Sequence, residues 1–290
     1  MNKVLITGAG GQLGTELRRT VPSGCKVIAC TAKDLDITDR DLVGQIMERI
    51  RPTLVINAAA YTRVDDAESE PDRAHAVNAQ GAANVAEMAH RIGARMIQIS
   101  TDFVFDGSLG RPYTPDDEPE PLGVYGQSKL EGERLVQERT GSAALIVRTA
   151  WVYAAQGHNF VGSMLRLMRQ RESIGVVSDQ VGTPTWARGL AEALWAARGL
   201  PDVRGTVHWT DAGVASWYDF AVAIQEEALA LGLLAHAIPI IPLRTDQFPR
   251  PAPRPGYSVL DKTSGWTVLG SKPTHWRVNL RRMLQGLALA

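Results

Sequence analysis

Short apolar runs alternate with segments of helical periodicity along the first half of the chain. The apolar runs predict five strands, at residues 3–7, 26–30, 54–57, 95–100 and 144–148. The amphipathic segments between them predict helices, at residues 15–20, 41–50, 71–92 and 124–139. Because parallel strands need helical crossovers, this alternation predicts an α/β fold with a doubly wound parallel sheet.

The pattern changes after residue 150. Helical segments are predicted at residues 160–169, 188–197, 216–231 and 276–287, with short strands at 175–177 and 206–209 and a proline-rich loop at 245–255. Four of the seven tryptophans lie between residues 186 and 217, which favours a part that supplies a pocket. We therefore expect a dinucleotide-binding sheet domain at residues 1–150. We expect a smaller α/β part, mainly substrate-binding, at residues 151–290, with the chain crossing between the two in places.

A glycine-rich turn directly follows the first predicted strand. It contains Gly8, Gly11, Gln12, Leu13 and Gly14, and a predicted helix comes next. Strand, glycine turn and helix in this order are typical of a dinucleotide site. Gly8 allows the tight turn, Gly11 lets the backbone approach a pyrophosphate, and Gly14 lets the helix pack closely, while the helix N-terminus offers N–H groups to the phosphates. The alternative is an ordinary glycine-rich turn of an α/β protein.

The end of the second predicted strand bears on the choice of cofactor. A site selective for NAD usually places an acid there, on the ribose hydroxyls. Here Lys33 precedes the first acid, so we expect weak NAD preference and a contact between Lys33 and a 2′-phosphate. Asp36 and Ile37 are candidates for the rim of the adenine pocket, although an aspartate there also suits a turn.

Three alanines, Ala58, Ala59 and Ala60, follow the third predicted strand. Small residues at this end of a strand leave room for a flat ligand in the crevice outside the sheet. Tight packing would explain them equally well. We include them in the expected cofactor site.

Candidate acid–base chemistry lies at the fourth strand and the following helix. Tyr125 and Lys129 are four residues apart and therefore share one face of a helix. A lysine ammonium beside a phenol favours the phenolate and lowers the tyrosine pKa from its usual value near ~10. Such a phenol can protonate a carbonyl oxygen as a hydride reaches the carbon, and the Thr101 hydroxyl can hydrogen-bond the same oxygen. Because this spacing also occurs by chance, its meaning depends on its surroundings.

Composition narrows the function classes. The 290 residues carry 31 basic and 31 acidic side chains, and this balance gives no electrostatic footprint for nucleic acid or an anionic membrane. No apolar run approaches the ~20 residues that span a bilayer. With two cysteines and scattered histidines, the chain has no disulfide framework or zinc motif, so we expect a reduced, cytoplasmic setting.

Together these motifs resemble the extended short-chain dehydrogenase/reductases. Several longer segments are more specific and resemble the dTDP-4-dehydrorhamnose reductase family. They are residues 11–14, 57–62, 64–68, 77–79, 100–107, 124–126, 148–153, 159–160, 179–185 and 254–255. The resemblance therefore covers nearly the whole chain.

The resemblance implies a Rossmann-like fold and a reaction. The reaction is the reduction of the C4 keto group of dTDP-4-dehydro-β-L-rhamnose to dTDP-β-L-rhamnose with NADPH or NADH, for cell-surface polysaccharides. By the same resemblance, Tyr125 donates the proton to the C4 oxygen, and Thr101 polarises the carbonyl. Lys129 tunes Tyr125 and holds the nicotinamide ribose.

A dTDP-sugar also implies a pocket for its diphosphate, which needs cationic or N–H partners. We expect Arg254 to make such a contact and Asn159 to cap a helix start, and we include both in the substrate site. Trp151 is expected to wall the sugar, and Asp102, next to Thr101, is included in the substrate site. A structural role is the alternative for Arg254, Asn159 and Trp151.

Two positions depart from the family's pattern. Phe103 stands where the family commonly has tyrosine. Some members bind Mg²⁺ at a dimer interface through a glutamate that matches Glu16 and later acidic residues, but here Arg188 stands in that later region, one turn before Glu192. A cation beside a metal-ligand set is unfavourable, so Mg²⁺ is doubtful and a homodimer stays open.

Two alternatives to the reduction of dTDP-4-dehydrorhamnose remain at this point. Dehydratases of the same superfamily need a carboxyl where Phe103 stands, which argues against dehydration. A nucleotide-sugar epimerase or another 4-ketosugar reductase uses the same tyrosine and lysine. A non-catalytic subunit that binds NADP, like the β subunit of methionine adenosyltransferase, is the alternative of another class.

Overall fold

Six parallel strands form the central sheet of the computed structural model, which describes residues 3–272 and 274–289. Their order across the sheet is β10-β5-β4-β3-β1-β2. Their bounds are β1 (Lys3–Thr7), β2 (Lys26–Ala29), β3 (Leu54–Asn57), β4 (Arg95–Thr101), β5 (Leu145–Thr149) and β10 (Gly205–His208). The predicted Rossmann-like, doubly wound parallel sheet is confirmed.

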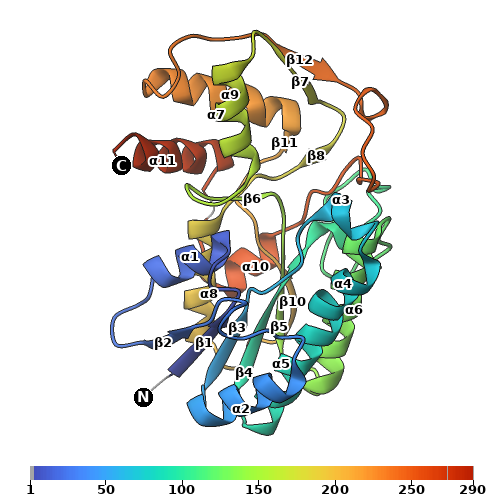
Figure 1. Cartoon of the computed structure of the whole chain (residues 1–290), viewed down its shortest axis with the longest axis vertical. Coiled ribbons are helices and arrows are strands. Elements are labelled where there is room, and N and C mark those ends of the chain that lie inside the picture. The colour runs from blue at the N-terminus through green and yellow to red at the C-terminus, as the bar shows by residue number, and fades with distance from the viewer. Residues whose placement is uncertain (1–2, 273, 290) are drawn as a thin grey trace.

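Helices cover both faces of this sheet (Figure 1). On one face lie α1 (Gln12–Arg19) and α8 (Ala187–Arg198), and on the other lie α2 (Arg40–Ile50), α5 (Ala82–Arg91) and α6 (Val124–Arg139). The alternation of β1 fits this arrangement, because Val4 and Ile6 pack in the core under α1 and α8, whereas Leu5 packs in the core under α2 and α5. Within the described part of the chain, no helix has both the length and the apolarity to cross a membrane.

The strand order reverses at β1, with β2 on one side of it and β3 on the other. In doubly wound sheets a ligand crevice lies outside the carboxyl ends of the strands at such a point. Here these ends carry buried polar side chains. The Thr7 hydroxyl donates to Asn57 Oδ1, and Asn57 Nδ2 donates to Gln98 Oε1 at 2.7 Å. The three strands β1, β3 and β4 are thus held in register at the edge of the crevice.

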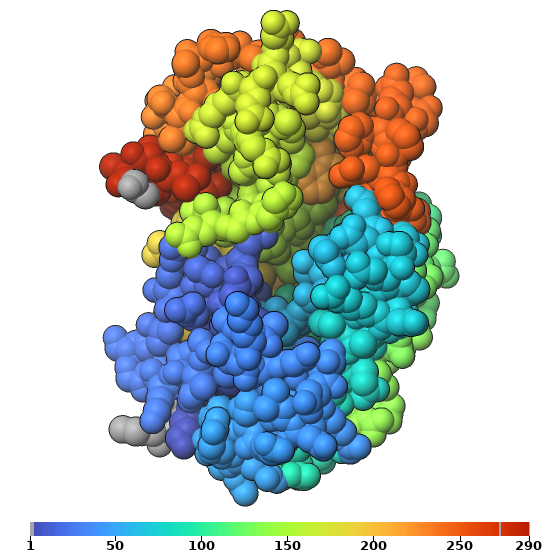
Figure 2. Space-filling model, viewed as in Figure 1, coloured from blue at the N-terminus to red at the C-terminus, as the bar shows by residue number. Residues whose placement is uncertain are grey.

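A second lobe lies above the carboxyl ends of the strands (Figures 1 and 2). Its helices are α7 (Phe160–Gln170), α9 (Trp217–Ala230) and α11 (Trp276–Ala288). Short strand pairs complete it: β6 (Val152–Tyr153) with β9 (Thr185–Trp186), β7 (Ile174–Val177) with β12 (Ile240–Leu243), and β8 (Val181–Gly182) with β11 (Ala215–Ser216). Tyr153, Phe220 and Trp276 lie in one shared core. The chain returns to the sheet for α8, β10 and the short α10 (Thr263–Val268), which packs on β10.

One predicted helix differs from the structure. Residues 71–92 form α4 (Pro71–His75), a π-helical turn η1 (Ala76–Gly81) and then α5, rather than one uniform helix. Short elements also escaped prediction, namely α3 (Val64–Ala67), α10, the strands β6, β8, β9, β11 and β12, and the turns η2 (Asp102–Val104) and η3 (Thr245–Gln247). Such pieces are too short for a periodic pattern, and tertiary contacts fix them.

The π-helical turn is where α6 comes closest to the rest of the sheet lobe. A Cβ on Gly132 would lie 2.1 Å from the Asn78 carbonyl oxygen, so only glycine permits this approach. Asn78 uses its side chain in the same contact: Nδ2 donates to Ser128 Oγ and to the Tyr61 carbonyl, each at 3.0 Å, and Oδ1 accepts from the Tyr61 N–H at 2.8 Å. This packing fixes the rotation and height of α6.

Replacing Gly132 with alanine should therefore destabilise the fold. The new methyl would meet backbone, which cannot move aside, so we expect a loss of about 1–3 kcal/mol in the free energy of unfolding, measured by urea denaturation. Gly286→Ala is the matched control, because no atom lies within 4 Å of its Cβ position, and alanine favours the helix there. Equal stability of the two variants would contradict the packing argument.

Candidate active site

The first turns of α6 present Tyr125 and Lys129 on one face, toward the end of β4. Tyr125 is half-buried and Lys129 is 4% exposed. A Cβ on Gly126 would lie 2.2 Å from the Phe103 carbonyl oxygen, so α6 also packs closely on η2. The phenol and the ammonium predicted from sequence are therefore held on a helix that packs closely at Gly126, between the two residues, and at Gly132, beyond Lys129.

Thr101 ends β4 beside Tyr125. Its hydroxyl donates to Asp102 Oδ1 at 3.1 Å and accepts from the Phe103 N–H at 3.2 Å. Asp102 is buried, and its other carboxylate oxygen accepts from the Ser258 hydroxyl at 2.6 Å. Burial raises the pKa of Asp102 to about 6. Asp102 thus ties the end of β4 to a loop from the second half of the chain.

The pKa of Tyr125 is raised, whereas the sequence led us to expect a lowered value. Burial raises the pKa of Tyr125 to about 12, the Thr101 hydroxyl opposes this shift, and the Asp102 charge adds to it. Lys129 does not lower the pKa of Tyr125 in this structure, because its ammonium donates to the Ile99 carbonyl at 2.7 Å. Burial also lowers the pKa of Lys129, to about 8. The expected effect of Lys129 on the phenol is therefore wrong for the protein alone.

The glycine turn has the geometry of a phosphate cradle. Gly8 has φ of +66°, and a Cβ there would lie 2.5 Å from the Ala58 backbone. A Cβ on Gly14 would lie 2.3 Å from the Gly8 carbonyl oxygen. At Gly11, by contrast, the nearest atom would be Gly8 O at 3.4 Å, an ordinary contact. The protein itself requires glycine at positions 8 and 14 but not at 11, where the space faces the crevice.

Gly11 is also the N-cap of α1, and no side chain caps the helix there. The predicted cofactor residues Gln12 and Leu13 form its first turn. Free N–H groups and the positive end of the helix dipole favour an anion at such a terminus. The turn, the helix start and the absent Cβ at Gly11 fit the pyrophosphate of NAD(P)H.

Ala58, Ala59 and Ala60 are partly exposed at the end of β3. Ala58 and Ala59 form the wall against which Gly8 packs. These contacts support the packing role considered for the alanines, and their place in the cofactor site stays a prediction.

After β2, the side chain of Lys33 is free, among the residues that the structure describes, of local partners of the kind that hold the first acidic residue, Asp34. Lys33 is exposed. The Asp34 carboxylate accepts from the Thr31 N–H at 2.9 Å and the Thr31 hydroxyl at 2.7 Å, so it caps its own turn. These bonds lower the pKa of Asp34. Asp34, the acidic residue that could bind the ribose hydroxyls, is thus already hydrogen-bonded to Thr31.

Asp36 and Ile37 lie further from the glycine turn in chain order. Asp36 caps a turn, accepting from the N–H and the hydroxyl of Thr38 at 2.9 and 2.8 Å. Ile37 is 3% exposed and packs on Gly81 and on the core beneath α5. In this structure both residues have local structural partners.

Trp151 lies where the second lobe begins. Its φ of +46° is rare for a residue with a side chain, and strain of this kind is concentrated at functional sites. Its ring stacks on Trp217 with centroids 3.5 Å apart, over Gly182, where a Cβ would lie 2.5 Å from the indole. Trp151 and Trp217 line a small cavity together with Phe103, Gln180, Arg254, Pro255 and Ser258.

Arg254 reaches this small cavity from the proline-rich loop. Its Nη1 donates to Asp65 Oδ1 at 2.9 Å and to the Ala252 carbonyl at 3.0 Å. Arg250 also pairs with Asp65, at 3.5 Å, but is half exposed. Arg254 is thus held at the pocket by a carboxylate from the sheet lobe.

Asn159 lies at a different place in the cleft. Its Oδ1 accepts from the Gly162 N–H at 3.0 Å and caps α7, as the sequence suggested. Its Nδ2 donates to Gln12 Oε1 at 3.0 Å and to the Ala154 carbonyl at 2.8 Å. It therefore joins the second lobe to the glycine turn and does not line the cavity of Trp151.

Sequence reasoning missed four residues of the site: Asp65, Gln180, Trp217 and Ser258. Asp65 and Gln180 lie in family-like segments, so closer attention to those segments could have found them. Trp217 and Ser258 carry no local pattern, because only the folded chain brings them to Trp151 and Asp102.

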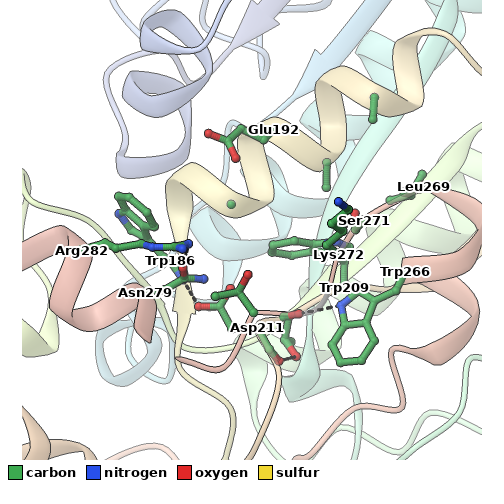
Figure 3. A pocket seen from close by; sticks show the side chains of 16 residues that line it. Trp186, Glu192, Trp209, Asp211, Trp266, Leu269, Ser271, Lys272, Asn279 and Arg282 are labelled. Carbon is green, nitrogen blue, oxygen red and sulfur yellow. Dashed lines mark hydrogen bonds between the residues drawn. The ribbon is translucent and has the colours of Figure 1, made fainter. Parts of the chain in front are cut away.

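A larger cavity of about 320 Å³ lies elsewhere, between α8, α10 and α11 (Figure 3). Its walls include Trp186, Trp209 and Trp266, with Asp211 and Asn279 among the polar residues. Burial raises the pKa of Asp211 to about 7. None of the predicted site residues lines it. Residue chemistry, rather than cavity size, therefore locates the candidate active site.

With this geometry established, comparison with known proteins gives a family. The chain matches the family described as "RmlD substrate binding domain" over residues 1–289. The chain belongs to this family. The resemblance to the dTDP-4-dehydrorhamnose reductases, within the extended short-chain dehydrogenase/reductases, is thereby confirmed.

Relatives of this RmlD-family chain match it from end to end. The spore coat polysaccharide biosynthesis protein SpsK of Bacillus subtilis (strain 168) is 43% identical over 98% of each chain. The dTDP-4-dehydrorhamnose reductase of Aggregatibacter actinomycetemcomitans is 40% identical, also over 98% of each chain. The crystal structure of dTDP-4-dehydrorhamnose reductase from Bacillus anthracis str. Ames in complex with NADP has a TM-score of 0.91 and 37% identity, and the match covers 98% of each chain.

The positions at which the family resemblance suggested Mg²⁺ are engaged in ion pairs. Glu16 pairs with Arg19 at 3.0 Å, and Arg188 pairs with Glu192 at 3.1 Å. Among the residues that the structure describes, no group of three or more His, Cys, Asp or Glu side chains could hold a metal ion. Within the described chain, Glu16 and Glu192 are thus each neutralised by an arginine.

The glycine turn yields a prediction that separates binding from folding. Gly11→Ala should lower the melting temperature only slightly, because alanine is a poorer N-cap than glycine. It should weaken NADPH binding by about tenfold or more, because its methyl would occupy the space of the pyrophosphate. Gly14→Ala should instead lower stability, because its methyl would meet the Gly8 carbonyl. NADPH fluorescence titration and thermal unfolding measure the two effects. Wild-type NADPH affinity in Gly11→Ala would contradict the assignment of the cradle.

Proposed function

We propose that this protein reduces the C4 keto group of dTDP-4-dehydro-β-L-rhamnose to dTDP-β-L-rhamnose, with NADPH or NADH as the reductant. It thereby serves dTDP-rhamnose and cell-surface polysaccharide biosynthesis. One observation carries the proposal: Thr101, Tyr125 and Lys129 lie together at the carboxyl end of β4, in a chain of the RmlD family.

Tyr125 is the proton donor in this proposal. Because burial raises the pKa of Tyr125 to about 12, the phenol keeps its proton at neutral pH and can give it to the C4 oxygen. The cofactor, when bound, supplies the hydride to C4. Proton donation leaves a phenolate, which the Lys129 ammonium stabilises once it turns toward the phenol and the nicotinamide ribose.

Thr101 polarises the substrate carbonyl. Its hydroxyl now donates to Asp102, so it turns toward the substrate oxygen when the sugar binds, as a freely rotating hydroxyl can. A hydrogen-bond donor at the oxygen where negative charge develops lowers the barrier to the reaction. Asp102 then has a supporting role on the substrate side, through Thr101 and Ser258.

The substrate site uses the small cavity of the second lobe. Trp151, stacked on Trp217, provides an apolar wall for the sugar. Arg254 provides a cation for the diphosphate, and Nη1 is the guanidinium nitrogen that Asp65 holds. Asn159 contributes by keeping the glycine turn and α7 together at the mouth of the cleft.

The cofactor site consists of the glycine turn, Ala58–60 and Lys129. We assign Lys33 to the 2′-phosphate of NADPH, since its ammonium is exposed and Asp34 is engaged by Thr31. This assignment favours NADPH over NADH, as a lysine suits a phosphate and an acid suits a ribose diol.

The reaction is tested with purified protein and dTDP-4-dehydrorhamnose made in situ, by following the absorbance of the reduced nicotinamide as NADPH, and then NADH, is consumed. The wild type should consume the cofactor, faster with NADPH, and Tyr125→Phe should lower kcat by about 10²–10⁴-fold, because the proton donor is lost. Circular dichroism confirms that the variant folds. No turnover in a protein that still binds NADPH would overturn the proposal and leave the epimerase and regulatory-subunit alternatives.

The contact between Arg254 and the diphosphate is tested by substituting, in turn, the two arginines that pair with Asp65. Arg254→Gln should raise the KM for the dTDP-sugar about tenfold or more while changing kcat less, because a charge-assisted contact with the diphosphate is lost. Arg250→Gln is the matched control and should change KM little, since Arg250 is half exposed and lies outside the cavity. Equal effects of the two variants would show that Arg254 only anchors the loop.

A further inference from the structure

The stripe of functional residues on α6 extends one turn beyond Lys129. Glu133 follows Lys129 by four residues, as Lys129 follows Tyr125, so all three share a helix face. Glu133 is 4% exposed, and Arg148 near the end of β5 is also 4% exposed. A carboxylate is rarely buried to this degree without a specific partner.

Arg148 holds Glu133 through three hydrogen bonds. Arg148 Nε donates to both carboxylate oxygens, at 2.9 and 3.2 Å, and Arg148 Nη2 donates to Oε2 at 2.7 Å. Within residues 3–272 and 274–289, Arg148 makes its side-chain hydrogen bonds to Glu133 alone, and its Nη1 has no partner. The Phe105 ring lies 5.1 Å from the guanidinium carbon. Arg148 therefore serves chiefly to fix the Glu133 carboxylate.

A negative charge near Lys129 would stabilise its buried ammonium. Lys129 is buried, and its ammonium donates to one carbonyl, that of Ile99, at 2.7 Å. Burial disfavours an ammonium and lowers the pKa of Lys129 to about 8, while the Glu133 charge acts in the opposite direction. Without Glu133, the lysine would lose its proton at a lower pH.

The other charged and titratable groups around this site act differently. Tyr125 is neutral, because burial raises its pKa to about 12, and Asp102 is bonded to Thr101 and Ser258. His208 lies beside Arg148 across β5 and β10, and burial, followed by the Arg148 charge, lowers its pKa to about 3. Glu131, on the solvent side of the same helix, pairs with His75.

A purely structural ion pair is the competing explanation. Buried pairs of this kind add little stability compared with apolar residues of the same size, since both charges must be desolvated. A contribution to stability therefore does not by itself explain why a buried ion pair lies one helical turn from Lys129.

We propose that Glu133, fixed by Arg148, is a positioning residue that keeps Lys129 protonated in its buried site. The proposal rests on the proposed function, in which the Lys129 ammonium stabilises the phenolate and binds the nicotinamide ribose. Glu133 itself touches neither substrate nor cofactor and acts through Lys129.

The direct test is the pKa of Lys129 in the full-length protein, measured by NMR titration with ¹³Cε-labelled lysine. The chain has six lysines, and the Lys129→Arg variant identifies the resonance by its loss. Glu133→Gln should lower the pKa of Lys129 by about one unit or more, because the attractive charge is removed. Glu131→Gln is the matched control on the same helix and should leave it unchanged. An unchanged Lys129 pKa in a folded Glu133→Gln protein would overturn the proposal.

Activity provides a second, separate readout. The alkaline limb of the kcat/KM profile should move to lower pH in Glu133→Gln by the same amount, and Glu133→Asp, which keeps the charge, should largely restore it. A structural role alone would lower activity without moving the limb. Failure of the wild type to turn over the ketosugar would refute the proposed function, whereas the NMR titration would still decide the role of Glu133.

Glu133→Gln leaves the buried Arg148 without its partner and can unfold the protein. The Glu133→Gln/Arg148→Gln double variant removes both charges and keeps side chains of similar size. Its Lys129 pKa should also fall, because burial still disfavours the ammonium and the Glu133 charge that opposes this effect is gone. An unchanged pKa in the folded double variant would overturn the proposal in the same way.

Discussion

The close approach of α6 to the π-helical turn and to the end of β4 is the constraint on which the site depends. Gly126 and Gly132 permit this approach, because a side chain at either position would clash with a backbone carbonyl oxygen. Asn78 then fixes the contact with hydrogen bonds to Ser128 and Tyr61. With α6 fixed in height and rotation, its stripe of tyrosine, lysine and glutamate points to the carboxyl end of the sheet.

The cleft is assembled by polar ties between segments that are far apart in the sequence. Ser258 donates to Asp102, and Arg254 donates to Asp65, so the proline-rich loop is held against the sheet lobe at two points. Asn159 donates to Gln12 and links the start of α7 to the glycine turn. Each tie joins a residue of the sheet lobe to a residue of the second half of the chain, so the two sides of the cleft are held together by polar contacts.

Burial governs the charges at this site more than the spacing of residues does. A tyrosine and a lysine one turn apart suggested a lowered phenol pKa, yet burial raises the pKa of Tyr125 and Lys129 bonds to the Ile99 carbonyl. Spacing placed these groups correctly on one helix face. Their ionisation depends on desolvation and on partners such as Asp102 and Glu133, which come from the surrounding packing.

The sequence by itself determined the alternation of strands and helices, the glycine turn and the helix that carries Tyr125 and Lys129, because periodicity and steric rules act over a few residues. It could not place Trp217 against Trp151, or Ser258 on Asp102, since no local pattern links residues 66 or 156 positions apart. It also did not reveal the π-helical turn, which arises where α6 packs on Asn78. Only the tertiary structure decided these contacts, because they depend on which surfaces the folded chain brings together.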